Sequence, residues 1–455
     1  MRTASSWLER RFVLAQRGSS AGRELLAGLT TFLTLSYILF AQPAILGNTG
    51  MPRDDVFLAT CVASAVGCAL MGWLANYPVA LAPAMGHNVF FAFTVCGVLG
   101  YTWQQALAAN LVAGLFFALT ARLRLREYVM ATVPGPLRYA IAAGIGMLIA
   151  FLGLQWAHFV RDDPVVLVNR ASLANPVALA ALAGLAVAAT GLSLRLPGAF
   201  LAGIAASSIV LYAYGLLPTD ALRHPVSLPQ PSGQTLFAFD FGWLFSGFGD
   251  LTRGLAIVFV FLVLDLFDTV GTLLGLSHAA GLLKGDRLPR AQEALFSDAA
   301  ATVVGCCLGT STVTSYIESS AGIAAGGRTG LTALCVALLF LASLPLAPLA
   351  SIIGAPISFE GRSYYPTIAP ILILVGVLMA TGLREVRWSD PTEAIPTFLT
   401  VLIMMSSFSI TDGIAWGYGS YVVLKTLRGE RLPAVLYAIA ALFVLHFVVM
   451  ELLAA

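Results

Sequence analysis

Two aspartates, Asp265 and Asp268, lie three positions apart inside an apolar stretch that covers residues 251–276. This spacing puts both carboxylates on one face of a helix. Even on the lenient insertion scale, each ionised aspartate costs about 2.5–3.5 kcal/mol at the centre of a bilayer, and neighbouring carboxylates repel each other. We therefore expect at least one of the pair to take up a proton near neutral pH. The alternative is that protonated or capped aspartates only hold neighbouring helices together.

A third carboxylate and a carboxamide lie in two other apolar stretches. Glu318 stands among serines and threonines, where it either takes part in function or caps a helix end. The donors and acceptors of Asn88 suit the edge of a flat heterocycle, or the residue adopts turn or capping geometry. Phe90 could stack on such a ring, although aromatic residues are also ordinary packing residues. His87 either titrates or is a buried structural histidine.

The composition identifies the setting of these residues. The chain has 455 residues, a formal charge of +2, 11% charged residues and 58% residues of the AVILMFWYC set, with a mean hydropathy of +0.87. A soluble fold of this length cannot bury so much apolar surface, and disordered chains have the opposite composition. No basic run indicates nucleic-acid binding. Because the apolar stretches reach the length of a spanning helix, we expect an all-α polytopic membrane protein rather than a β-barrel.

We expect about fourteen transmembrane spans in two series of seven. The first series occupies 24–216, after a polar tail (1–23) that lacks the features of a cleavable signal peptide, and the second occupies 251–455. The stretch 217–250 is an extramembrane connection between them. The individual spans are expected near 24–46, 56–76, 78–96, 103–121, 137–156, 174–194, 199–216, 251–276, 295–311, 313–326, 329–350, 366–383, 396–424 and 432–454.

Lysine and arginine residues in short loops set the orientation of the chain. Most of them precede the first span or follow an even-numbered span, which puts the N-terminus in the cytoplasm. These are Arg2, Arg10, Arg11, Arg17, Arg23, Arg122, Arg124, Arg126, Arg138, Arg195, Lys284, Arg287, Arg290, Arg328, Arg384 and Arg387. The loop with Lys425, Arg428 and Arg431 disagrees. Either 396–424 is a bent hairpin or this loop breaks the rule, so the side of the C-terminus stays open.

An internal repeat indicates two inverted halves. Residues 63–70 (ASAVGCAL) resemble residues 301–308 (ATVVGCCL), 238 positions further on. Seven spans separate the copies, and this odd number makes them point in opposite directions, as in many secondary transporters. An interrupted segment follows each copy. Residues 77–88 contain two prolines and residues 309–322 are crowded with hydroxyl groups, and paired broken segments predict a binding site near the midplane.

The remaining polar residues indicate no further site. The cysteines lie in apolar stretches, and we expect them to be small buried residues rather than disulfides or zinc ligands. The histidines show no metal-ligand spacing. Asp54–Asp55 and Glu293–Asp298 fall in or near expected loops, so we expect these carboxylates to be solvated. Buried acids and few fixed cations favour a small N–H-bearing molecule, a cation or protons over an anionic substrate.

The strings DLFDTVGT (265–272), TSYIES (314–319), GIAAGGRTG (322–330) and APAMGHN (82–88) resemble a known family. It is the purine permeases of the AzgA-like branch of the nucleobase–cation symporter-2, or nucleobase–ascorbate transporter, superfamily. The resemblance covers nearly the whole chain. It implies a core domain (about 24–121 and 251–350) that moves against a gate domain (about 137–216 and 366–454). It also implies short antiparallel strands that join half-helices in spans 3 and 10.

The resemblance also implies a function. Members import adenine, guanine or hypoxanthine across the cell membrane with protons, without a cofactor, by elevator-like alternating access, and relatives work as homodimers. The implied partners are thus a nucleobase, lipid and a second subunit, and no nucleic acid. By position, Asp265 and Glu318 correspond to substrate-binding and proton-linked acids, and Asn88 to a polar substrate-binding residue. Asp268 corresponds to an acid of the transport cycle.

Two departures from the family pattern affect substrate specificity. The family usually has Gly at position 84 and an apolar residue at position 87, where this chain has Ala84 and His87. A uracil or xanthine permease of the same superfamily is therefore the alternative reading. A channel would need a continuous pore. An intramembrane aspartyl enzyme would need its acids on facing helices, whereas Asp265 and Asp268 share one turn, so we expect no enzyme.

Overall fold

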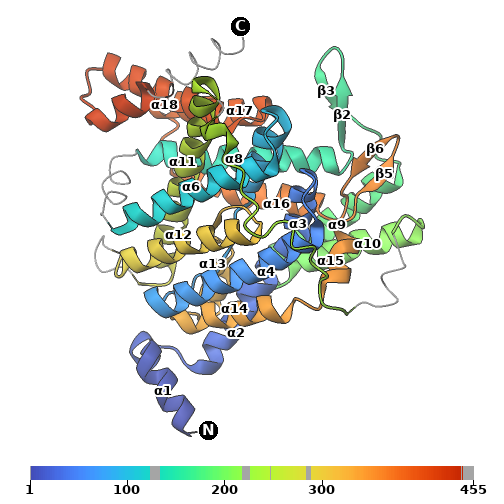
Figure 1. Ribbon diagram of the computed structural model, residues 1–455, viewed down its shortest axis with the longest axis vertical. Coiled ribbons are helices and arrows are strands. Elements are labelled where there is room, and N and C mark those ends of the chain that lie inside the picture. The colour runs from blue at the N-terminus through green and yellow to red at the C-terminus, as the bar shows by residue number, and fades with distance from the viewer. Residues whose placement is uncertain are drawn as a thin grey trace.

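Figure 1 shows the computed structural model of the chain, a predominantly helical molecule. The structure describes residues 2–122, 134–217, 226–245, 247–282, 288–441 and 443. Among the described residues, four helical segments are by length and composition alone long and apolar enough to cross a bilayer: Ala21–Gly47, Arg53–Ala75, Gly135–Trp156 and Pro176–Ser193. Some of the other expected spans, such as the third and the tenth, are interrupted, as described below.

One set of helices, here called the core group, packs around α4 and α12. In α4 the small residues of the repeated motif, including Gly67, let neighbouring backbones approach closely. The core group consists of α2 (Ala21–Leu35), α3 (Ile38–Gly47), α4 (Arg53–Leu70) with the π-helical turn η2 (Met71–Ala75), α6 (Trp103–Arg122), α11 (Phe248–Ala279), α12 (Ala291–Leu308), α14 (Gly330–Ala342) and α15 (Ala347–Ile353).

A second set, here called the gate group, packs around α8 and α16. A Cβ atom at Gly146 of α8 would lie 2.9 Å from the Gly376 carbonyl oxygen of α16, so glycines set the close approach of these two helices. The gate group consists of α8 (Gly135–Trp156), α9 (Pro176–Ser193), α10 (Ala199–Ala213), α16 (Ala369–Ala380) with the 3₁₀ turn η6 (Thr381–Glu385), α17 (Pro391–Ser407) and α18 (Ile410–Leu427).

Two short strands meet where the third and tenth spans are interrupted. Strand β1 (Leu81–Pro83) pairs antiparallel with β4 (Val313–Ser315), with Leu81 opposite Ser315. Proline lacks the N–H that a helix needs, so the two prolines of residues 78–83 force this segment out of helical geometry. Helix α5 (Met85–Val89) and the π-helix η3 (Phe90–Val98) continue from β1, and α13 (Ser319–Ala324) follows β4. This arrangement confirms the predicted fold class.

The repeated motif supports each strand in an equivalent way. A Cβ at Gly67 would lie 3.1 Å from Leu81 of β1, and a Cβ at Gly305 would lie 2.9 Å from Val313 of β4. Side chains of the same helices bond the strands: Cys68 Sγ accepts from Leu81 N at 3.1 Å, and Thr302 Oγ1 accepts from Val313 N at 3.2 Å. The glycine that the two copies share is therefore a strand contact in both halves.

Two expected spans contain breaks that the sequence did not indicate. The first span divides into α2 and α3 at Ser36–Tyr37, and the eleventh divides into α14 and α15. The stretch 396–424 is not a single helix but the hairpin α17–α18, which turns at Phe408 with φ of 54°. The hairpin is antiparallel, because Gly413 packs on Met404 and Gly417 packs on Thr400 of α17.

The hairpin decides between the two readings of the basic loop after residue 424. Arg428 at the end of α18 lies 2.9 Å from Asp390, which caps the start of α17. The loop with Lys425 and Arg428 therefore lies at the same end of the molecule as Arg384 and Arg387. It no longer contradicts the distribution of basic residues between the two ends. The last expected span, 432–454, lies outside the described residues after 443, as do Arg124, Arg126, Lys284, Arg287 and the 218–225 part of the connection.

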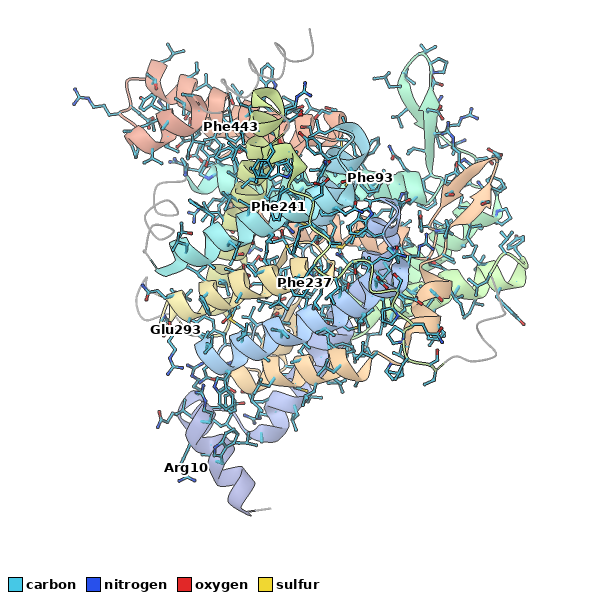
Figure 2. The ribbon with its side chains drawn as sticks, viewed as in Figure 1. Arg10, Phe93, Phe237, Phe241, Glu293 and Phe443 are labelled. Atoms are coloured by element: carbon cyan, nitrogen blue, oxygen red, sulfur yellow. The ribbon has the colours of Figure 1, made fainter. Side chains whose placement is uncertain are left out.

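Two β-hairpins and the connection 226–245, here called the strap, cover one end of the bundle. Strands β2 (Val160–Asp163) and β3 (Leu167–Arg170) form one hairpin, and β5 (Ile357–Phe359) and β6 (Arg362–Tyr364) form another, visible at the upper right of Figure 1. The connection 226–245, with the 3₁₀ turn η5 (Gly242–Leu244), crosses the core group, where Phe237 N donates to Cys307 O (Figure 2). The N-terminal helix α1 (Arg2–Phe12) and the turn η1 (Ala15–Arg17) lie at the opposite end, at the bottom of Figure 1.

The strap also overturns one expectation about surface carboxylates. Asp55, expected to be solvated, is only 3% exposed. Its oxygens accept from Ser232 N at 2.6 Å, from Ser232 Oγ at 2.8 Å and from Thr235 N at 3.3 Å. The carboxylate is buried because the connection folds back onto the start of α4, which a local sequence pattern does not reveal.

Candidate functional site

Glu318 lies at the break of the tenth span, as the N-cap residue of α13, and is 5% exposed. The hydroxyl of Tyr37, from the break of the first span, donates to its Oε1 at 2.9 Å. Tyr316 donates through its hydroxyl to Pro83 O of β1, which ties the two broken segments together. The carboxylate is thus held in the irregular middle of the core group, between three chain breaks.

The two aspartates of α11 face different neighbours. Asp265 Oδ1 accepts from Thr269 Oγ1 at 3.2 Å, one turn along the same helix. Asp268 lies close enough to Asp298 and Glu318 for their charges to interact. The spacing of three residues puts both on one side of α11, but Asp265 turns towards α12, where Cys306 lies within range of its charge. The structure therefore places Asp268 within range of the charges of Asp298 and Glu318, and Thr269 links Asp265 to Asp298.

A fourth carboxylate, Asp298 of α12, belongs to this cluster and contradicts the expectation of a solvated residue. It is fully buried, and its oxygens accept from Thr269 Oγ1 at 2.8 Å and from Ser315 N at 3.1 Å. Helix α12 begins at Ala291, so position 298 is already two turns inside it. The signal was present, since Asp298 falls within the expected span 295–311.

One hydroxyl connects the carboxylates. Thr269 Oγ1 lies within bonding distance of Asp265, of Asp298 and, at 2.8 Å, of Thr314 Oγ1 in β4. A threonine hydroxyl has one proton to donate and two lone pairs to accept with. It can therefore donate to only one of the two carboxylates at a time, so the hydrogen bonds on Asp265 and Asp298 are coupled.

Asn88 lies on the other side of the strand pair, fully buried in α5. Its Oδ1 accepts from Gln42 Nε2 at 3.1 Å and from Ser311 Oγ, and its Nδ2 donates to Gln42 Oε1. Gln42 Nε2 also lies 2.8 Å from Thr310 Oγ1. The amide of Asn88 is therefore largely occupied by protein partners and joins α3 to both broken segments.

Gln42 is a second residue that sequence reasoning missed. It is fully buried in α3, next to Pro43, in a span that otherwise reads as apolar. A single glutamine within a span is costly without partners, because no water is present to satisfy its amide. That cost was the available signal, and the structure shows the partners.

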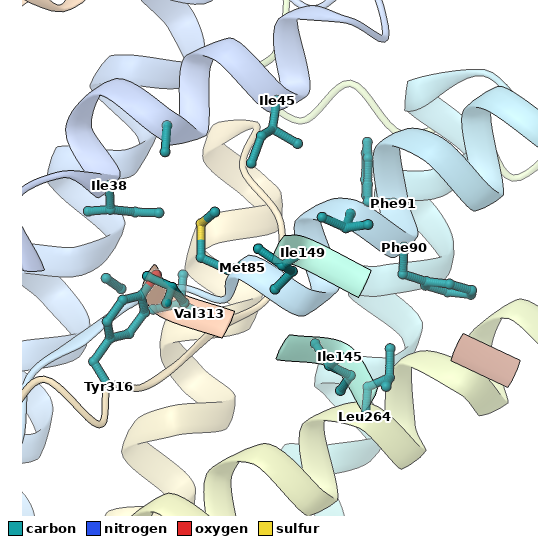
Figure 3. Close-up of a cluster of buried hydrophobic side chains, with 14 of the residues drawn as sticks. Ile38, Ile45, Met85, Phe90, Phe91, Ile145, Ile149, Leu264, Val313 and Tyr316 are labelled. Atoms are coloured by element: carbon teal, nitrogen blue, oxygen red, sulfur yellow. The ribbon is translucent and has the colours of Figure 1, made fainter. Parts of the chain in front are cut away.

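The aromatic and specificity candidates pack beside α11. Phe90 meets Phe261 edge-on, with ring centroids 5.0 Å apart, and His87 lies nearly parallel to the same ring at 6.5 Å. His87 Nε2 has no hydrogen-bond partner among the described residues. Ala84 continues the strand pairing, because its N–H donates to Thr312 O at 2.9 Å. Phe90 and its neighbours face Ile145 and Ile149 of the gate group (Figure 3).

The site offers carboxylates, hydroxyl groups and amides that lie among buried segments of irregular backbone. Among the described residues, no group of three or more His, Cys, Asp or Glu side chains is placed to hold a metal ion. The available chemistry is therefore hydrogen bonding to N–H donors and exchange of protons among acids that lie close together.

Comparison with known proteins identifies similar chains. The family model Xan_ur_permease, described as a permease family, matches residues 22–415. The guanine/hypoxanthine permease PbuO of Bacillus subtilis (strain 168) is 40% identical over 424 residues, which cover 92% of this chain and 95% of the relative. The adenine permease AdeP of Escherichia coli (strain K12) is 40% identical over 450 residues, which cover 98% and 96%.

Solved structures resemble the fold. The transmembrane domain of a cyanobacterium bicarbonate transporter, BicA, superposes with a TM-score of 0.61 at 16% sequence identity, covering 87% of this chain and 97% of that one. SLC26A9 superposes with a TM-score of 0.59 at 12% identity, covering 89% and 65%. At these identities the likeness concerns the fold alone and carries no information on the substrate.

Proposed function

Because the chain belongs to the permease family Xan_ur_permease, within the nucleobase–ascorbate transporter superfamily, we propose that it imports purine nucleobases together with protons. Membership confirms the resemblance that the motifs indicated. Two relatives of similar identity are named for guanine and hypoxanthine and for adenine. These names support hypoxanthine, guanine and adenine as substrates here, with uracil or xanthine as the alternative.

The observation that carries the proposal is the buried Glu318 beside the paired half-strands, held by Tyr37 and within range of the charge of Asp268. A purine carries ring N–H groups on its edges, and carboxylates are the strongest acceptors for them. We assign Glu318 and Asp265 to these N–H groups. Asn88 reads a complementary edge by exchanging one of its protein partners for the base, and Phe90 lines the same side.

Proton coupling follows from the number of acids in the cluster. Asp265, Asp298 and Glu318 are buried and Asp268 is partly buried, and neighbouring carboxylates in a medium of low dielectric constant repel strongly. The cluster therefore retains at least one proton, and binding or release of the base changes how many. This links the proton gradient to loading without a cofactor.

The division into two packing groups supports an elevator-like cycle. The broken segments and all four carboxylates belong to the core group, while the gate group packs on itself through α8–α16, α9–α10 and α17–α18. We propose that the core group slides past the gate group with the base bound. The chain then acts as a transporter rather than an enzyme, in the cell membrane with its N-terminus in the cytoplasm, and as a homodimer.

The test is uptake of radiolabelled hypoxanthine in cells that lack their own purine transport. Unlabelled adenine, guanine, xanthine, uracil and cytosine compete in parallel, with and without a protonophore. We expect saturable uptake that purines block and the protonophore abolishes. Uptake that uracil or xanthine blocks better than purines would assign the alternative substrate, and uptake that survives the protonophore would refute proton coupling.

A further inference from the structure

One side chain touches both packing groups at the centre of the molecule. Tyr37 lies in the break between α2 and α3 and is 1% exposed. Its hydroxyl donates to Glu318 Oε1 at 2.9 Å. Its ring meets Phe200 of α10 edge-on, with centroids 5.2 Å apart and planes at 70°. Phe200 is itself fully buried and belongs to the gate group.

The position of Tyr37 in the chain gives it room to respond. A continuous i→i−4 ladder would fix the backbone that carries this ring, but residues 36 and 37 form a turn between two helices. Leu39 N and Phe40 N bond back to Ser36 O and Tyr37 O in the tighter i→i−3 pattern. The phenol therefore stands at a joint of the first span, with its polar end on the core group and its apolar face on the gate group.

We propose that Tyr37 is a positioning residue that couples the state of Glu318 to the contact between core and gate groups. Its hydroxyl orients the Glu318 carboxylate, and its ring transmits a change at that carboxylate to Phe200. This inference rests on the proposed function, since it assigns to Glu318 the role of holding the transported base.

The coupling follows from the geometry of a phenol. The hydroxyl and the ring are one rigid plane, so the oxygen cannot follow a moving carboxylate without moving the ring edge that Phe200 contacts. Glu318 also faces Asp268, and the Tyr316 hydroxyl lies within bonding range of Tyr37. When the base or a proton takes over Oε1, Tyr37 loses its acceptor, and its contact with Phe200 changes. Binding at Glu318 thus changes the contact between Tyr37 and α10, the gate-group helix past which the core group slides.

Two substitutions separate the two ends of Tyr37. Tyr37→Phe removes the hydroxyl that orients Glu318 and links it to the ring, so we expect KM for hypoxanthine to rise about tenfold and the maximal rate to fall as well. Phe200→Leu keeps the hydrogen bond and removes the ring contact, so we expect a lower maximal rate with KM nearly unchanged. A residue that only stabilised the fold would lower the amount of protein and leave KM unchanged in both variants.

Tyr365→Phe is the matched control. Tyr365 is also a buried tyrosine between the two groups, and its hydroxyl donates to Asn48 Oδ1 at 3.1 Å, away from Glu318. The variant loses the same kind of bond, and we expect its KM to stay at the wild-type value. A KM rise of equal size in Tyr365→Phe and Tyr37→Phe would overturn the proposal, because the effect would then not depend on Glu318.

A double-mutant cycle in purified protein tests the coupling without transport. If Tyr37 acts through Glu318, Tyr37→Phe lowers the melting temperature of the wild-type chain but has a smaller effect on Glu318→Ala, which has no acceptor for the hydroxyl, so the two shifts do not add. Additive shifts together with an unchanged KM overturn the inference. Absence of any purine uptake by the wild-type chain refutes the proposed function instead, and the cycle still decides whether the two residues are coupled.

Discussion

The interrupted third and tenth spans have the same architecture, but one carries a neutral amide and the other a carboxylate. Each follows a copy of the repeated motif, contributes three residues to the β1–β4 pair and continues into a short helix. The third segment ends in an amide, Asn88, whose donors and acceptors meet Gln42 and Ser311. The tenth carries a carboxylate, Glu318, at the N-cap of α13, and Tyr37 binds one of its oxygens. The two short helices that follow the strands thus carry a neutral group within one and an acidic group at the start of the other.

This difference teaches how an inverted repeat divides its tasks. The neutral half fixes the geometry, because protein partners hold most of the Asn88 amide and an amide does not titrate. The acidic half, with Asp268 and Asp298 nearby, stores charge and can exchange protons. Substitutions in the tenth segment should therefore affect transport directly, whereas substitutions in the third should act first on stability and affinity.

The largest effect is expected from Glu318→Gln. The amide keeps the size of the side chain and still accepts from Tyr37, but it removes the charge and the ability to exchange a proton. We expect hypoxanthine uptake to fall at least about a hundredfold with normal amounts of protein in the membrane, since bonds to charged acceptors are the stronger class. Asp265→Asn should behave alike.

The control for charge removal is Glu385→Gln. Glu385 pairs with Arg384 at an exposed position at the end of η6. Loss of this surface charge should leave uptake at the wild-type level. Normal transport by Glu318→Gln would remove the carboxylate from the mechanism. It would also erase the contrast between the two broken segments.

A smaller but still large loss is expected from Asp298→Asn. In Asp298→Asn the oxygen can keep the bond from the Ser315 N–H, but the NH₂ group faces Thr269 Oγ1 as a donor, so the threonine hydroxyl must donate elsewhere. We expect a loss of uptake of at least about tenfold, because the change removes one buried carboxylate and its hydrogen bond from Thr269, and bonds to charged acceptors are the stronger class. Thr269→Ser keeps the hydroxyl and should transport, whereas Thr269→Val should resemble Asp298→Asn. Equal uptake by these two Thr269 variants would contradict a role for the shared hydroxyl.

The sequence predicts the broken segments well, for a physical reason. Prolines and clustered hydroxyls are local features that disturb a helix wherever the chain folds. The same holds for Asp265, Asp268 and Glu318, since a carboxylate in an apolar stretch stands out without knowledge of its neighbours. These expectations required only the residue and its immediate surroundings.

The features that were missed depend on contacts between distant parts of the chain. Asp55 is buried only because the returning connection covers it. Asp298 differs, since it falls within the expected span 295–311 and the sequence alone could have predicted its burial. The α17–α18 turn has Phe408 at a positive φ, where Gly or Asn would be the usual signal. No proline or glycine at residues 36–37 marks the break between α2 and α3. The contacts of Tyr37 could not be predicted either, because Glu318 and Phe200 lie far away in sequence.

A moderate effect is expected from Gln42→Ala, on the neutral side of the comparison. The change leaves the Asn88 amide and Thr310 without their buried partner. Leaving such a group unsatisfied destabilises by about 1–3 kcal/mol, so we expect a lower melting temperature and weaker hypoxanthine binding. Transport should remain measurable at high substrate concentration. Complete loss of transport with unchanged stability would place Gln42 on the acidic side of the division.

The smallest effect is expected where charges pair in water. Arg362 of β6 donates to Asp162 of β2 through Nη1 at 2.8 Å and through Nη2 at 3.1 Å. This ion pair joins the two hairpins at one end of the bundle. Both side chains are exposed, so solvent and salt screen their attraction. We expect Arg362→Gln to leave the melting temperature and purine uptake at pH 7 unchanged within error.

The pH dependence of this ion pair separates it from the buried carboxylates. The hydrogen bonds from Arg362 hold the pKa of the Asp162 carboxyl below its usual range. A lowered pKa in the folded state means that any contribution is present above the ordinary aspartate value and is lost as the pH falls through the lowered one. Melting curves of wild type and Arg362→Gln should therefore coincide in strong acid and differ at most slightly at neutral pH. A changed pH profile of uptake near neutrality in Arg362→Gln would mean that groups outside the core group also set the pH dependence of transport. The contrast between the neutral and acidic segments would then not be enough to explain that dependence.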